Sequence, residues 1–225
     1  MNKKKGIAVA VVLLLILLIG GMLAYFTDSD SETNVFVLGD EVKIRLDETA
    51  WDALADTNNN DIPDIAEGIH PGTEVAKDPV VVNTSTTTPA YVFLKVTVPC
   101  YDAGYTDTSL AATITRDTEL FTLKNLTGAN WTTLSESEIS NDGTKTYVYY
   151  YGTASGLTAL EPSQSTSPLF TAATLKSTIT STEAKTAPAN PNIEVSAYAI
   201  QTDGLSQSTP AGVYSLYTNQ NNPNP

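Results

Sequence analysis

The sequence predicts an all-β protein: an antiparallel, jelly-roll-like β-sandwich with short helices in its connections, preceded by an N-terminal signal helix. Three observations predict this fold. Strand-like segments dominate from residue 41 onward, the connections between them are long, and strands do not alternate with helices. No internal repeat or second domain is visible, so we expect one β-sandwich domain over residues 41–216.

Residues 1–24 have the organisation of a secretory signal peptide. A basic start, Lys3 to Lys5, precedes an uncharged run from Gly6 to Phe26, as in the basic and apolar regions of such signals. Ala24 is the small residue best placed for cleavage, so the mature chain should begin at or near Tyr25. A retained transmembrane anchor is the alternative, because about 20 apolar residues can span a bilayer.

The charge of the chain limits the classes of molecule that it is expected to bind. Of its 225 residues, 12 are basic and 25 acidic, and cleavage after Ala24 would leave nine basic residues and a side-chain charge of −16. This argues against nucleic-acid binding, which needs a basic face. It suits a secreted protein, whether the charge serves cation binding or solubility alone.

Residues 25–40 combine a polar arm with a short apolar segment. The arm from Phe26 to Thr33 includes three acidic residues. After cleavage, the apolar segment would be a strand tethered only at its C-terminal end, able to fold back onto its own sheet or to enter a neighbour's sheet. This candidate donor strand consists of Asn34, Val35, Phe36, Val37 and Leu38.

Further elements follow in chain order from periodicity and turn signals. Residues 41–47 alternate apolar and charged side chains, which predicts a half-buried strand. Asp142-Gly143 supplies a hairpin turn before the next strand. The remaining predictions are a short helix at 48–55, extended segments at 75–83 and 90–98, strands at 145–151 and 193–200, and a polar, disordered tail at 217–225.

The loop from Asp56 to Glu67 carries the pattern of a calcium site. Oxygen-bearing side chains occupy loop positions 1, 3, 5, 9 and 12, and calcium takes about six to eight oxygens. Asp61 replaces the glycine usual at position 6, where aspartate tolerates a left-handed backbone better than most residues. A plain Asn-rich turn is the alternative. The candidate ligands are Asp56, Asn58, Asn60, Asp64 and Glu67 through side chains, and Ile62 through its carbonyl.

The sequence offers little for catalysis. It has no His-Glu-x-x-His pair, no Gly-x-Ser-x-Gly and no phosphate-binding glycine loop. We interpret the single cysteine, Cys100, as a buried structural thiol and the single histidine, His70, as a surface or loop residue. The tyrosines at 147 and 149–151 could form a face for a partner or for sugars; we favour an ordinary strand, with Tyr147, Tyr149 and Tyr151 on one side.

Several segments carry a family resemblance in addition to the basic and apolar signal region. They are Ala24–Asp28, Asn34–Gly39, Pro71–Gly72, Lys77–Thr84, Ala90–Val92 and Val195–Gln201. Together they resemble the TasA/camelysin family of secreted biofilm-matrix proteins of Gram-positive bacteria, whose signal is handled by a SipW-like signal peptidase. The resemblance covers roughly residues 1–100 and 190–203; residues 101–190 match only as β-rich sequence.

The resemblance implies a jelly-roll protein exported to the cell surface or extracellular matrix. It further implies self-assembly into fibres, with each subunit's Asn34–Leu38 strand completing the next subunit's sheet, and a possible matrix accessory protein as a partner. Some relatives have been described as metallopeptidases, but this sequence lacks a zinc-ligand set, so we expect no enzyme. A monomeric, calcium-stabilised surface adhesin or binding module is the alternative, and a camelysin-like metallopeptidase is a third, less favoured hypothesis.

Overall fold

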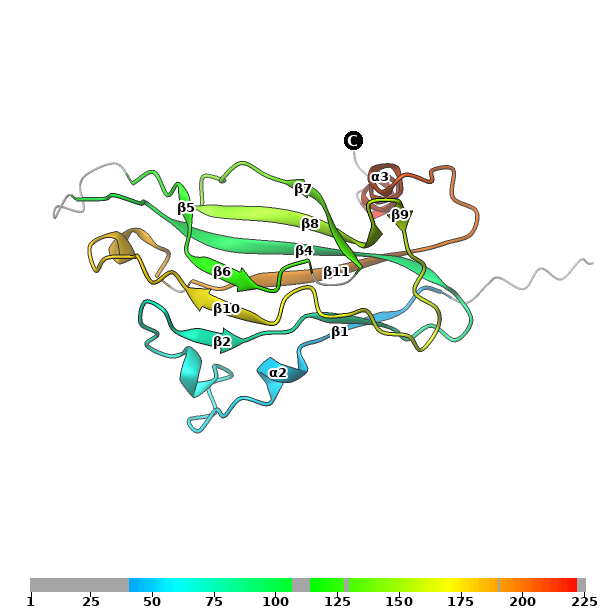
Figure 1. The fold of residues 1–225 in the computed structure, drawn as a ribbon. Helices are drawn as coiled ribbons and strands as arrows, with labels where there is room; N and C mark the ends of the chain where they lie inside the picture. The colour runs from blue at the N-terminus through cyan, green and yellow to red at the C-terminus, as the bar shows by residue number, and fades with distance from the viewer. Residues whose placement is uncertain (1–40, 107–113, 128–129, 190, 222–225) are drawn as a thin grey trace, which may run out of the picture. The chain divides into compact units, whose positions relative to one another are not determined.

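The computed structural model describes residues 41–106, 114–127, 130–189 and 191–221. It confirms the predicted all-β fold: the strands pair antiparallel in two layers, with few short helices between them (Figure 1). None of the helices in this part of the chain is long and apolar enough to cross a membrane. The predicted signal segment, the Ala24–Tyr25 cleavage site and the Asn34–Leu38 strand lie outside the described residues.

The first layer is built around β4 (Ala90–Tyr101). The strand order is β11-β4-β8-β7, from β11 (Glu194–Gln201) through β8 (Thr144–Thr153) to β7 (Trp131–Glu136). β4 occupies an interior place because both its faces are apolar: Phe93 and Leu94 point to opposite faces and are each 0% exposed. Two short strands extend the layer, β5 (Thr118–Glu119) beside β4 and β9 (Gly156–Leu157) beside β8.

The hairpin between β7 and β8 contains the predicted turn. Gly143 has a φ of 78°, the left-handed conformation for which Asp-Gly was expected. β8 therefore begins at Thr144, close to the predicted start.

The second layer consists of shorter strands. β1 (Ile44–Asp47) pairs with β3 (Val80–Asn83), and β10 (Ala172–Leu175) pairs with both β2 (Glu74–Ala76) and β6 (Phe121–Lys124). The same segment, residues 164–175, pairs with both β3 and β2. Asn83 N donates to Gln164 O (2.9 Å), and Lys77 N donates to Thr171 O (3.3 Å). Residues 74–83 and 164–175 thus run beside each other along this layer, and Pro79, which cannot donate, stands between the two short strands.

The main core lies between the layers. Its largest fully buried side chains include Leu94 and Tyr149 from the first layer and Val81, Leu169 and Phe170 from the second. β1 covers this core with one face only, since Ile44 and Leu46 are half-buried and Arg45 is exposed, as its alternation predicted. The predicted helix at 48–55 is limited to α2 (Thr49–Asp52).

The C-terminal helix α3 (Pro210–Asn221) corrects one expectation. The tail from Tyr217 was predicted to be disordered, but residues 217–221 continue this helix. Thr209 caps the helix, its hydroxyl accepting from Gly212 N at 3.2 Å. Val213 is 0% exposed against the outer face of the first layer, and the Tyr217 ring lies 5.1 Å from that of Tyr198. Tertiary packing therefore stabilises a helix that polar composition disfavours.

Two single-turn 3-10 helices complete the described elements. η1 (Asp64–Ala66) lies within the predicted calcium loop, and η2 (Glu183–Thr186) precedes β11.

Candidate functional site

An apolar groove of about 640 Å³ opens beside β2. Three parts of the chain form it: the connection between β1 and β2, the strands of the second layer, and the segment that precedes β11. The groove reaches the main core, because Val75, Phe121 and Ala173 in its wall are between 6% and 8% exposed. Its lining consists of Trp51, Ile62, Ala66, Gly68, Ile69, Val75, Lys77, Phe121, Ala173, Ala189, Pro191, Asn192 and Ile193.

Within the described residues, β2 is one of the two end strands of its sheet, with β6 at the other end. β1 does not extend past it, because Asp47 pairs with Val80 and the chain then turns into α2. Lys77 N and Thr73 O bond toward the β10 side. By the alternation of an antiparallel strand, the backbone groups of Glu74 and Ala76 point the other way, toward the outer edge.

A charged pair anchors α2 at this groove. The Lys77 Nζ lies 2.6 Å from Glu48 Oε2 and 5.0 Å from the centre of the Trp51 ring. The side chains of Lys77 and Glu48 are only 11% and 18% exposed, so this ion pair is shielded from water. The other carboxylate oxygen, Glu48 Oε1, is buried without a hydrogen-bond partner in the described structure. The pair holds Trp51 as one wall of the groove.

The predicted calcium loop contributes Ile62 and Ala66 to the lining of the groove. Ile62, its predicted carbonyl ligand, lines the groove with its side chain and is 45% exposed. Asp61 has a φ of 64°, so the aspartate does adopt the left-handed bend that the pattern requires at position 6. The Asp56 carboxylate accepts backbone N–H groups from Asn60 (3.3 Å) and Asp61 (3.0 Å).

The remaining predicted ligands contact one another or neighbouring groups. Glu67 Oε1 accepts both the Asn58 amide (3.0 Å) and the Asn60 amide (2.6 Å). Asp64 instead accepts the backbone N–H of Thr57 at 3.0 Å. In the described part of the chain, no three His, Cys, Asp or Glu side chains gather as they would around a metal ion. The amide oxygens of both asparagines would have to turn inward to complete a calcium shell.

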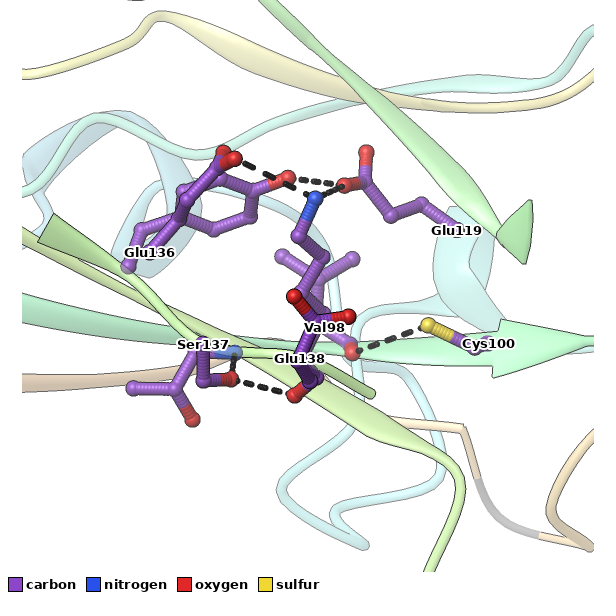
Figure 2. A network of polar contacts seen from close by, with 9 residues as sticks. Val98, Cys100, Glu119, Glu136, Ser137 and Glu138 are labelled. Carbon is purple, nitrogen blue, oxygen red and sulfur yellow. Dashed lines mark hydrogen bonds and ion pairs between the residues drawn. The ribbon is translucent and has the colours of Figure 1, made fainter. Parts of the chain in front are cut away.

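A smaller cavity of about 250 Å³ is lined by residues of β4, β5, β6 and β8, by Leu126 and by Lys176. A polar network borders it. The Lys145 ammonium lies 3.6 Å from both Glu119 and Glu136, and the Tyr147 hydroxyl donates to Glu119 (Figure 2). Hydrogen bonding to Tyr147 raises the pKa of Lys145 above its usual range. The amine therefore stays charged and links Glu119 to Glu136.

Cys100 lies at the edge of the same network and is buried, as predicted. Burial, aided by the charge of Glu119, raises the pKa of its thiol to about 11. Its Sγ contacts only Val98 O, at 3.9 Å, among the hydrogen bonds described. Since the thiolate is the nucleophile, the group is chemically passive at neutral pH.

The predictions for the tyrosines and His70 are also confirmed. Tyr149 is 1% exposed, and Tyr147 and Tyr151 pack with it on the main core. Tyr150 faces the second cluster under α3. His70 is exposed in a turn.

Asn83 is a structural residue that the sequence analysis missed. It is 0% exposed, and its amide donates to Leu160 O at 2.8 Å and Thr88 O at 3.0 Å. Its side-chain oxygen accepts from Ser85 N at 3.0 Å. The residue thus links the end of β3 to two loops, and an asparagine closing a run of three valines was its only sequence signal.

Comparison of the chain with protein-family models, with curated proteins and with solved structures finds no match. The resemblance to the TasA/camelysin family therefore stays a prediction.

Proposed function

We propose that this protein is a secreted structural subunit of an extracellular matrix, of the TasA/camelysin kind, which assembles head to tail through its N-terminal strand. One observation carries the proposal: among the described residues, β2 is an end strand of its sheet and lies beside an apolar groove that reaches the core. An end strand is a template for another chain. The apolar Asn34–Leu38 segment, freed by cleavage at Ala24, has the length and composition of a strand that could use it.

The physical basis is strand addition. Backbone hydrogen bonds supply affinity, and alternate side chains inserted into a sandwich supply register. A contact between one subunit's N-terminus and the next subunit's sheet is heterologous, so it does not close and gives a fibre. The strongly acidic surface opposes unspecific association, which makes assembly sensitive to salt. Neither a catalytic role nor nucleic-acid binding belongs to this proposal.

The test compares two single charges in the mature chain. Val37→Asp places a carboxylate within the inserted strand, whereas Thr33→Asp places the same charge in the polar arm. Burying an unpaired charge is costly, so Val37→Asp should shift sedimentation from polymer to monomer, and Thr33→Asp should leave the polymer fraction near that of the parent. Equal polymer fractions in the two variants would refute strand donation by this segment.

Calcium stabilisation of the Asp56–Glu67 loop is the second part of the proposal, and it also fits a monomeric adhesin. It is favoured by the left-handed Asp61 and by the contacts of Asn58 and Asn60 with Glu67. If calcium binds the folded state alone, at a hundredfold excess over Kd it should add about 2.7 kcal/mol. Chelation should then lower the melting temperature, and Glu67→Gln should remove this effect. Identical melting curves with calcium and with chelator would reduce the loop to an Asn-rich turn.

A further inference from the structure

We infer that Tyr198 and Tyr217 form an oxidative cross-linking site, at which hydrogen peroxide and a peroxidase couple the two rings into dityrosine and thereby fix α3 to β11. This inference is independent of strand donation and of calcium binding. Three half-buried tyrosines, Tyr198, Tyr214 and Tyr217, carry it; they lie together on the outer face of the first layer.

The register of the first layer places Tyr198 on this face. Tyr198 of β11 pairs with Phe93 of β4, and directly opposite residues of an antiparallel pair project to the same face of a sheet. Phe93 packs with Val213 and Tyr150 in the cluster under α3. Tyr198 therefore stands beside Phe93, on the face that α3 covers.

The helix brings two more tyrosines to the same place. Tyr214 and Tyr217 are three positions apart and so share one side of α3, with their ring centres 6.4 Å apart. The Tyr214 ring lies 5.1 Å from that of Phe93, and the Tyr217 ring lies 5.1 Å from that of Tyr198. Of the tyrosine pairs found among the described residues, Tyr198 and Tyr217 have the closest rings.

Two rings in packing contact are placed for radical coupling. Oxidation removes one electron and one proton from each phenol, and the two radicals join through a carbon–carbon bond between ring positions next to the hydroxyls. The hydrogen atoms on the joined carbons then move to the phenol oxygens. Hydrogen peroxide accepts the two electrons and two protons and becomes two water molecules. Burial raises the pKa of Tyr217, so at neutral pH this phenol is protonated and loses its proton with the electron.

A second tyrosine pair in the same chain serves as a comparison. Tyr147 and Tyr149 stack with their ring centres 6.1 Å apart, but Tyr149 is 1% exposed and the Tyr147 hydroxyl donates to Glu119. A soluble oxidant therefore reaches this pair less readily. Proximity alone would cross-link both pairs, whereas the inferred site combines proximity with exposure.

The link would change the stability of the domain. Tyr217 follows Tyr198 by 19 positions, so a bond between their rings closes a loop of about this length and lowers the entropy of the unfolded chain. The linked protein should therefore melt about 5–10 °C higher than the unlinked protein.

The test oxidises the full mature chain, as an equal mixture of isotope-labelled and unlabelled molecules, with hydrogen peroxide and a haem peroxidase. Proteolytic cleavage at Asp203 separates Tyr198 from Tyr217 unless dityrosine joins them. Mass spectrometry then identifies the joined peptides by the two hydrogen atoms lost. The isotope label distinguishes a link within one chain from a link between two chains.

We expect the Tyr198–Tyr217 link to be at least about tenfold more abundant than a Tyr147–Tyr149 link, with both halves from one chain. Tyr198→Phe keeps the ring packing and should remove the link, whereas Tyr91→Phe, a matched change on the same face, should leave it. The inference would be overturned by a lack of dityrosine, by a predominant link elsewhere or between chains, or by equal melting temperatures of linked and unlinked protein. None of these outcomes bears on strand donation.

Discussion

Val213→Ala measures whether α3 is part of the folded domain. Val213 is 0% exposed and packs with Phe93, Tyr150 and Ile200 in the cluster between the helix and the first layer. The substitution removes the equivalent of two buried methylene groups, about 1.6 kcal/mol at 0.8 kcal/mol each. A residual cavity of roughly 50 Å³ would add about 1.2 kcal/mol if the site did not collapse.

Helix propensity acts in the opposite direction. Alanine favours a helix over valine by about 0.5 kcal/mol, so we expect a net loss of about 2 kcal/mol in the free energy of unfolding. For a domain of this size, that loss lowers the melting temperature by about 4–8 °C.

The assay is denaturant unfolding followed by fluorescence and circular dichroism, with Ser215→Ala as the control. Ser215 is exposed on the same helix, so its replacement should leave stability unchanged or slightly raised. If Val213→Ala and Ser215→Ala differed by less than about 0.5 kcal/mol, a typical error of such comparisons, the packing of α3 on the sheet would be refuted.

Two further predictions concern buried groups. Asn83→Ala should lower the free energy of unfolding by about 3 kcal/mol, because it removes the buried hydrogen bonds that the Asn83 side chain makes to Leu160 O and from Ser85 N; a loss below about 1 kcal/mol in urea unfolding would contradict this role. Cys100 should react with a thiol reagent at pH 8 at least about a hundredfold more slowly in the native than in the unfolded protein, and equal rates would show that it is accessible. Its thiol pKa is raised from 9.0 to about 11, so its contribution to stability is complete below pH 9.0 and is lost as the pH rises through about 11. Chemical unfolding between pH 8 and 11, compared with Cys100→Ala, measures that loss.

The sequence predicted the elements whose pattern is local. β4 and β11 follow from runs of β-branched and aromatic residues, and the turn before β8 follows from Asp142-Gly143. The helix α3 was missed because its stability comes from contacts with a sheet, part of which lies more than a hundred residues earlier in the chain. One such contact joins Phe93 and Tyr214, whose ring centres are 5.1 Å apart. Its Thr209-Pro210 start was the available signal.

The candidate site could be predicted only in parts. The oxygen pattern from Asp56 to Glu67 and the left-handed Asp61 follow from residue spacing and backbone preference. The groove does not, because Trp51, Ala173 and Ile193 come together only through the pairing of distant strands. The same holds for Asn83, whose partners include Leu160, 77 positions along the chain.

Electron microscopy of the purified mature protein, with and without residues 25–38, tests the central claim most directly. The account predicts fibres from the chain that begins at Tyr25. It predicts folded, unassembled subunits from the chain that begins at Gly39, because the described sandwich and its core are formed by later residues. If the shortened protein forms the same fibres as the full mature chain, assembly by donation of the Asn34–Leu38 strand is wrong.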